Sequence, residues 1–134
     1  MDTQEKQNVR IVKKLYEEAA AGNKEKCKEY FHPDVMIYEA PSMPYGGSWR
    51  GFDGWLRLLD EELKAYDDMS YMVEEYMAGG DWVAVLIHWT VRGKKTGKIA
   101  SFPATELFRL RDGKVIEMRM FYYDTKRASE VFGE

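Results

Sequence analysis

The hydrophobic period of the chain changes once, near Asp68, and this change limits the folds that the sequence can adopt. Before Asp68, apolar residues recur at spacings of three and four, as they do along one face of a helix. After it, apolar and polar residues alternate, as they do in strands with two different faces. Helices followed by a run of strands are typical of an α+β fold, in which helices cover one face of an antiparallel sheet.

Three helices are predicted before the change in period. The first ends near Gly22, and a short second helix over 24–31 has Asn23 available as its N-cap. The third covers 51–66, and its inward apolar stripe contains one polar residue, Glu62. These helices therefore offer apolar faces that a sheet can cover.

Five strands are predicted. One short strand over 35–39 precedes a loop over 40–48, which is rich in proline and glycine. The other four are separated by turns short enough to join antiparallel neighbours, and they are expected at 70–78, 82–92, 98–110 and 114–123. We therefore expect one domain over 1–134, with three N-terminal helices packed on an antiparallel sheet made of one short strand and a four-strand meander.

Composition argues against several kinds of partner. The net charge of −3 disfavours nucleic acid, because the chain as a whole repels a phosphate backbone. The one basic cluster, within 92–98, has the glycines of a hairpin turn and lacks the full phosphate-loop pattern. No apolar run approaches the length of about 20 residues that crosses a bilayer, so no membrane partner is expected.

The single cysteine and the N-terminal residues bear on the compartment. Cys27 has no second cysteine with which to form an intrachain disulfide, which suits a reducing environment. The first residues do not resemble a secretory signal. A cytoplasmic protein is therefore expected.

Both faces of the predicted strand 82–92 are largely apolar. One face carries Val83, Val85, Ile87, Trp89 and Val91, and the other carries Trp82, Ala84, Leu86, His88 and Thr90. The predicted helices can cover only one of these faces. We therefore expect the outer face to form a homodimer, the alternative being an unusually apolar monomer surface.

Four short motifs and the order of the predicted elements resemble the nuclear transport factor 2-like superfamily. The motifs lie at 15–23, 31–35, 89–93 and 112–124. The last two are similar to the polyketide-cyclase-like (SnoaL-like) and ketosteroid-isomerase-like branches. This resemblance implies a cone-shaped α+β barrel with a strongly curved sheet around a small-molecule pocket. The superfamily contains isomerases, cyclases, dehydratases, epoxide hydrolases and pure binding modules, so the fold alone does not choose an activity.

Two acidic residues are the leading catalytic candidates. The resemblance places Glu39, at the end of the first strand, at the position of the isomerase base, and Glu106 at the position of the protonated oxyanion-hole acid. Two carboxyls in one dry cavity would not both ionise easily, so one could act as base while the other keeps its proton. The alternatives are a solvated strand-end acid at Glu39 and a structural pair between Glu106 and Arg119 or His88.

Three further residues are candidates for assisting roles. His88 would point into the cavity if its face of the strand is the concave one, and otherwise it is a satisfied core residue. Asp124 lies at the edge of the strand on which related cyclases carry an acid, and it could equally cap a C-terminal helix. Tyr16 could donate its hydroxyl to a carbonyl oxygen, although the isomerase tyrosine aligns with Leu15.

An apolar wall is predicted around these groups. It is expected to consist of Trp49, Trp55, Leu59, Phe102, Phe108, Met118, Met120 and Tyr122. The histidine and cysteine spacing shows no metal site, and no nucleotide-binding motif is present, so no cofactor is expected.

We therefore predict an isomerase or cyclase that performs acid/base chemistry on a hydrophobic carbonyl compound. Two alternatives stay open at this point. One is a non-catalytic dimeric module that binds a small ligand, and the other is an activity of the hydratase, dehydratase or epoxide-hydrolase type.

Overall fold

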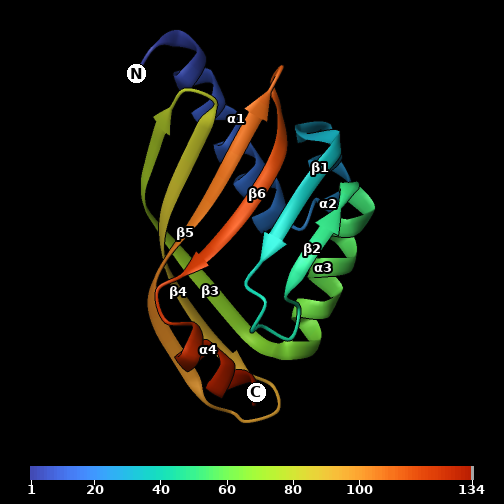
Figure 1. Ribbon diagram of the computed structural model, residues 1–134, viewed down its shortest axis with the longest axis vertical. Helices are drawn as coiled ribbons and strands as arrows, with labels where there is room; N and C mark the ends of the chain where they lie inside the picture. Colours follow the sequence, from blue (N-terminus) through green and yellow to red (C-terminus); the bar gives the residue numbers. More distant parts are fainter. Residues whose placement is uncertain (134) are drawn as a thin grey trace.

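The computed structural model describes residues 1–133 and confirms the predicted α+β fold (Figure 1). Within these residues, a six-stranded sheet has the order β2-β1-β6-β5-β4-β3. Its strands are β1 (Phe31–Glu39), β2 (Gly47–Arg50), β3 (Tyr66–Gly79), β4 (Trp82–Gly93), β5 (Ile99–Arg111) and β6 (Lys114–Tyr122). The helices are α1 (Thr3–Ala20), α2 (Lys24–Cys27), α3 (Gly51–Ala65) and α4 (Thr125–Phe132). The last four strands form the predicted antiparallel meander.

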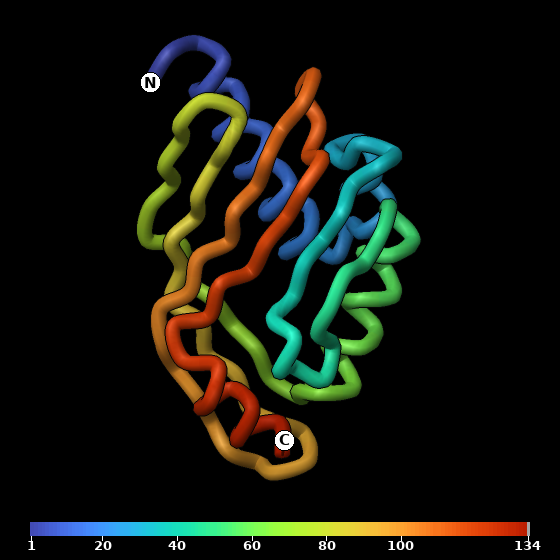
Figure 2. The backbone as a smooth tube through the Cα atoms, in the orientation of Figure 1, coloured from blue at the N-terminus to red at the C-terminus, as the bar shows by residue number. Residues whose placement is uncertain are grey.

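The sheet differs from the prediction at β1 and β2. The tube in Figure 2 shows β1 beside β6, and the two strands run parallel, so the sheet is mixed rather than purely antiparallel. The predicted loop over 40–48 contains the start of β2, which pairs antiparallel with β1 through partners such as Ile37 and Trp49. A four-residue strand that follows prolines and glycines carries too short an alternation to be recognised.

The N-terminal helices begin and end close to the predicted residues. The side chain of Asp2 accepts from the backbone N–H of Glu5, and the Glu5 side chain returns the bond, which forms a capping box at the start of α1. The predicted helix over 24–31 is a short α-helix followed by a 3₁₀ turn over Lys28–Tyr30. Asn23 precedes α2, but its side chain makes no capping bond and donates to Glu18 instead, so the predicted cap is wrong.

The concave face of the sheet packs against α1 and α3 and holds the core. On β4, the face that carries the residues from Val83 to Val91 is buried, whereas the residues of the opposite face, from Trp82 to Thr90, keep part of their surface exposed. Cys27 is free and buried. No helix in the described part of the chain is long and apolar enough to cross a membrane. The burial pattern of β4 shows that the helices cover the concave face of the sheet and leave the opposite face of this strand partly exposed.

The C-terminal helix α4 closes one end of the sheet beside the β4–β5 hairpin (Figure 1). The hydroxyl of Thr96, in the hairpin turn, donates to the backbone oxygen of Val131 at 2.5 Å. A Cβ atom at Gly93 would collide with that same oxygen, so the close approach of hairpin and helix requires glycine there.

Candidate active site

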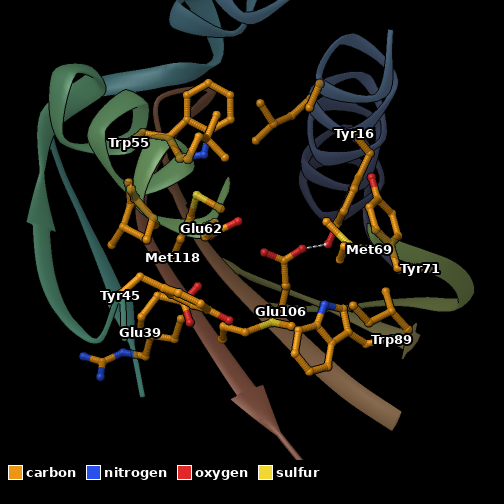
Figure 3. A pocket seen from close by; sticks show the side chains of 18 of the residues that line it. Tyr16, Glu39, Tyr45, Trp55, Glu62, Met69, Tyr71, Trp89, Glu106 and Met118 are labelled. Carbon is orange, nitrogen blue, oxygen red and sulfur yellow. Dashed lines mark hydrogen bonds between the residues drawn. The ribbon is translucent and has the colours of Figure 1, made fainter. Parts of the chain in front are cut away.

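A cavity of about 590 Å³ lies between the concave face of the sheet and helices α1 and α3 (Figure 3). Side chains from both helices and from five of the strands line it. Most of them are apolar or aromatic, including Trp55, Met69, Trp89, Phe108 and Met118. Its volume is typical of pockets that bind small molecules.

Three glutamates from three different elements point into this cavity. Glu39 ends β1, Glu106 lies on the inner face of β5, and Glu62 lies on the sheet-facing side of α3. Glu106 reaches the cavity because it shares strand parity with the buried residues Ala104 and Phe108. The helix and the sheet thus place carboxyl groups on two sides of one space.

Each of the three carboxyls accepts a hydrogen bond from a tyrosine. The Tyr122 hydroxyl donates to Oε1 of Glu39 at 2.7 Å, and the Tyr66 hydroxyl donates to Oε2 of Glu62 at 2.8 Å. Glu106 accepts from the hydroxyl of Tyr16. Each tyrosine bond satisfies one carboxyl oxygen and leaves the other available to the cavity.

A second tyrosine extends one of these pairs. The hydroxyls of Tyr45 and Tyr122 are 3.0 Å apart, so the pair of Tyr122 with Glu39 continues into a short chain of hydrogen bonds. Burial raises the pKa of each phenol that contacts a carboxyl, and the neighbouring glutamate raises it further. These hydroxyls therefore stay protonated and serve as donors at any ordinary pH.

No basic side chain among residues 1–133 forms an ion pair with the three carboxyls. Two basic residues, Lys24 and Arg119, contribute to the lining. Lys24 is exposed, and Arg119 is ion-paired with Glu117 and stacked on the ring of Tyr38 at 4.2 Å. The acidic groups of the cavity are therefore not neutralised by a fixed cation.

Burial is the main cause of the raised pKa of all three carboxyls. It raises the pKa of Glu39 well above its ordinary value, and repulsion from Glu62 and Glu106 adds to the effect against the opposing bond from Tyr122. Burial raises the pKa of Glu62 to about 7, with the Tyr66 bond opposing and the charge of Glu106 adding. The pKa of Glu106 is raised by burial alone and lowered by its bond from Tyr16.

These causes define the order in which the carboxyls ionise. The negative charge of Glu106 raises the pKa of both other groups, whereas neither of them raises the pKa of Glu106. Glu106 therefore loses its proton first, and Glu39 keeps its proton longest. Glu62 titrates close to neutral pH, between the other two.

Comparison of the sequence with protein-family models identifies the family of the chain. The family model described as the SnoaL-like domain matches residues 12–118. The chain belongs to this family. In a search of curated proteins, none matches the chain at a significant level.

Solved structures with a similar fold cover nearly the whole SnoaL-like chain. A nuclear transport factor 2-like protein from Burkholderia xenovorans LB400 has a TM-score of 0.86 at 25% identity and covers 96% of this chain and 97% of its own. A candidate SnoaL-like polyketide cyclase from Jannaschia sp. CCS1 has a TM-score of 0.83 at 22% identity, covering 100% and 97%. TerC, crystallised with polyporic acid, has a TM-score of 0.84 at 23% identity, covering 96% and 99%. At such identities these likenesses establish the fold and not the chemistry.

Most of the residues predicted from the sequence of this SnoaL-like domain lie in the cavity. Besides Glu39 and Glu106, they are Tyr16, Trp55, Leu59, Phe108, Met118, Met120 and Tyr122. Tyr16 does not stand free to meet a carbonyl oxygen, because its hydroxyl is bonded to Glu106.

Two predicted polar residues lie outside the cavity. His88 is on the outer face of β4, where its Nε2 lies 2.8 Å from the hydroxyl of Ser101. The prediction that His88 points into the cavity is therefore wrong. Asp124 is the N-cap of α4 and accepts from the backbone N–H of Arg127, which confirms the capping alternative. The inner face of β4 is the one that carries valines, and a histidine of the opposite parity must face away.

Two predicted wall residues also lie elsewhere. Trp49 is on β2, and its indole N–H donates to the backbone oxygen of Tyr45 at 3.1 Å. Phe102 is buried on β5 against Trp89, with ring centroids 5.4 Å apart, beyond the part of the strand that borders the cavity. Each of them thus contacts a residue that lines the cavity, Tyr45 or Trp89, without lining it itself.

The sequence interpretation missed Glu62 and the tyrosines at positions 45, 66 and 71 as site residues. Glu62 carried a signal, since it is a charged residue within the inward apolar stripe of its helix. Tyr66 follows it by one helical turn. Tyr45 belongs to an irregular segment, where no periodicity shows which way a side chain points.

The residues of the cavity do not resemble a metal site. Among residues 1–133, no three histidine, cysteine, aspartate or glutamate side chains are close enough together to hold a metal ion. The three cavity glutamates each accept a hydrogen bond from a different tyrosine instead. Their arrangement is suited to moving protons between a ligand and groups of different proton affinity.

Proposed function

We propose that this SnoaL-like domain catalyses proton transfer on a hydrophobic carbonyl compound, in a reaction of the isomerase or cyclase type. The observation that carries the proposal is the set of three carboxyls with raised pKa that share one mostly apolar cavity without a cationic partner. Perturbed carboxyls of this kind cluster at catalytic sites, because their environment both hinders and controls ionisation.

The order of ionisation favours the opposite assignment of acid and base from the one that the resemblance implies. Glu106 ionises first and is held by Tyr16, so we assign it as the base that removes a proton next to the carbonyl group. Glu39 keeps its proton and can donate it in a hydrogen bond to the oxygen on which negative charge develops. The bond from Tyr122 leaves Oε2 of Glu39 to carry that proton.

The walls of the cavity suit the remainder of such a substrate. Rings and methionine side chains offer apolar contact to a hydrocarbon skeleton, and they keep water away from the carboxyls. One fold neighbour, TerC, was crystallised with polyporic acid, which supports the idea that this fold holds a small molecule.

Catalysed hydrogen exchange on 2-tetralone, a hydrophobic bicyclic ketone, tests the proposal without knowledge of the natural substrate. In D₂O, removal of a proton next to the carbonyl replaces it by deuterium, which proton NMR follows directly. We expect the protein to accelerate this exchange above the background rate. Replacement of the base, Glu106→Gln, should reduce the acceleration by about 10² or more.

The matched control is Glu75→Gln, which changes an exposed glutamate of β3 that does not line the cavity. This variant should exchange 2-tetralone as the unchanged protein does. Binding of the ketone without accelerated exchange would favour the non-catalytic binding module instead. Full activity of the Glu106→Gln variant would remove Glu106 from the mechanism.

A further inference from the structure

The cavity holds more negative charge than the protein itself balances. Glu39, Glu62 and Glu106 all line it, and none of them forms an ion pair within residues 1–133. Taking a carboxylate out of water is costly unless a positive charge accompanies it. A ligand that carries a positive charge would remove this cost, whereas a neutral ligand would leave it in place.

Glu62 is the carboxyl that is placed to meet such a charge. It enters the cavity from α3, in the layer opposite Glu106, and has no part in the acid and base pair assigned above (Figure 3). Its Oε2 accepts from the hydroxyl of Tyr66 at 2.8 Å. Its Oε1 accepts no hydrogen bond from residues 1–133, and no fully buried side-chain oxygen of these residues lacks a partner, so Oε1 is open to the cavity.

A structural role does not explain why this residue is a glutamate. A glutamine would accept the same bond from Tyr66, and it would neither repel the charge of Glu106 nor raise the pKa of Glu39. The carboxyl is therefore unfavourable for the fold on its own. It becomes favourable when a cation lies beside it.

The walls near Glu62 suit an organic cation. Trp55 lies two helical turns before Glu62 on the same face of α3, and both side chains line the cavity (Figure 3). The ring of Tyr66 is held at Glu62 by its hydroxyl. The faces of such rings attract an ammonium group and pack against the hydrocarbon that bears it.

We propose that Glu62 binds a protonated amino group of the substrate, which makes the substrate a hydrophobic carbonyl compound that also carries a basic amine. This inference rests on the proposed function and specifies its substrate class. Glu106 and Glu39 act on the carbonyl end of the molecule, while Glu62 holds the ammonium group and thereby orients the skeleton between helix and sheet. No covalent bond forms or breaks at Glu62.

Binding of the amine is linked to the ionisation of Glu62. Its pKa of about 7 leaves a substantial protonated fraction near neutral pH, and an adjacent ammonium group lowers the pKa of a carboxyl. A proton therefore leaves the protein as the amine binds. The other ionisable side chains that line the cavity are Glu39, Glu106, Lys24, Arg119 and the tyrosines at positions 16, 45, 66, 71 and 122. Among the acids, Glu106 ionises before Glu62 and the phenols stay protonated, so only Glu39 competes with Glu62 as the source of this proton.

Titration calorimetry at pH 7 with three ligands of one skeleton tests the inference. 2-Aminotetralin carries the ammonium group, 2-tetralol replaces it by a neutral hydroxyl, and tetralin-2-carboxylate replaces it by an anion. We expect the amine to bind the unchanged protein about tenfold or more tighter than the alcohol, and the acid to bind weakest. In Glu62→Gln the affinity for the amine should fall about tenfold or more, while the affinity for the alcohol changes by less than about threefold.

Further measurements separate binding at Glu62 from a general attraction to the acidic cavity. Titration in two buffers of different protonation enthalpy gives the number of protons released, and this release should be largely lost in Glu62→Gln. The matched control is Glu61→Gln, which changes a carboxylate that bonds Lys64 at the surface and should bind all three ligands as the unchanged protein does. The amine should also inhibit the exchange of 2-tetralone, because both molecules occupy the same cavity.

Equal affinity for the amine and the alcohol would overturn the inference, and so would a Glu62→Gln variant that binds the amine as tightly as the unchanged protein. Exchange of 2-tetralone without a preference for the amine would leave the proposed function standing and remove only this substrate class. A preference for the amine that depends on Glu62, in a protein that exchanges no ketone, would instead keep the cation site and remove the proposed reaction.

Discussion

Replacement of Glu62 by glutamine should make the protein more stable at alkaline pH but not at acidic pH. The pKa of this carboxyl rises from its ordinary value of 4.5 in the unfolded chain to about 7 in the folded protein. Between these values the folded state binds more protons than the unfolded state, so the free energy of unfolding falls as the pH rises. The penalty is absent below about pH 4 and complete above about pH 8.

The size of the effect follows from the two pKa values. Each pH unit between 4.5 and about 7 contributes about 1.4 kcal/mol, so the carboxyl destabilises the fold by about 3 kcal/mol at high pH. Glutamine keeps the acceptor for Tyr66 and has no charge, so Glu62→Gln should recover most of this amount. Relief of the repulsion on Glu39 acts in the same direction.

Urea unfolding followed by tryptophan fluorescence at pH 5 and pH 8.5 measures the prediction. The difference between the variant and the unchanged protein should grow by about 2–3 kcal/mol from the lower to the higher pH. Glu61→Gln is the control, because its carboxylate lies at the surface beside Lys64 and should produce no such change. A stability difference that is the same at both pH values would refute the raised pKa of Glu62 and the reasoning built on it.

Three other predictions address the base, the end of the sheet and the outer face. Tyr16→Phe removes the bond that lowers the pKa of Glu106, so the rise of ketone exchange with pH should move up by about one pH unit or more. Gly93→Ala should destabilise the fold by about 2 kcal/mol or more, measured by thermal unfolding, whereas Gly79→Ala, with open space around its Cβ, should not. If a homodimer forms through the outer face, Leu86→Glu should shift the protein toward monomer in light scattering.

The outcomes that contradict these predictions are equally definite. An unmoved pH profile in Tyr16→Phe would show that the hydrogen bond does not control the base. Equal stability of the two alanine variants would mean that the hairpin and α4 adjust without strain. A protein that is monomeric before any substitution would leave Met72 and Phe121, which are 70% and 54% exposed on the outer side, as plain surface residues.

Local pattern accounts for most of the secondary structure. The helical spacing before Asp68 and the alternation after it predicted α1, α3 and the whole meander within a few residues. These elements are long and amphipathic, so the spacing of their apolar residues indicates which face must be buried. The β2 strand was not predicted because its four residues are too short to show an alternation, and the parallel pairing of β1 with β6 was not predicted because these strands lie far apart in the sequence.

The site divides in the same way. Alternation along β5 marked Glu106 as a charged residue on an apolar face, and that inference needed no knowledge of other elements. Alternation along β4 gave two apolar faces without saying which is concave, so His88 was assigned to the wrong one. The interrupted stripe of α3 contained Glu62, but nothing local showed that other carboxyls lie across from it.

The sequence by itself determined which residues alternate, which stripe is interrupted by a charge, and hence the class of fold. Only the tertiary structure decided that three glutamates from β1, α3 and β5 share one cavity and which of them ionises first. Periodicity is a property of neighbours along the chain, whereas desolvation and repulsion between carboxyls depend on distances through space that exist only once the chain has folded.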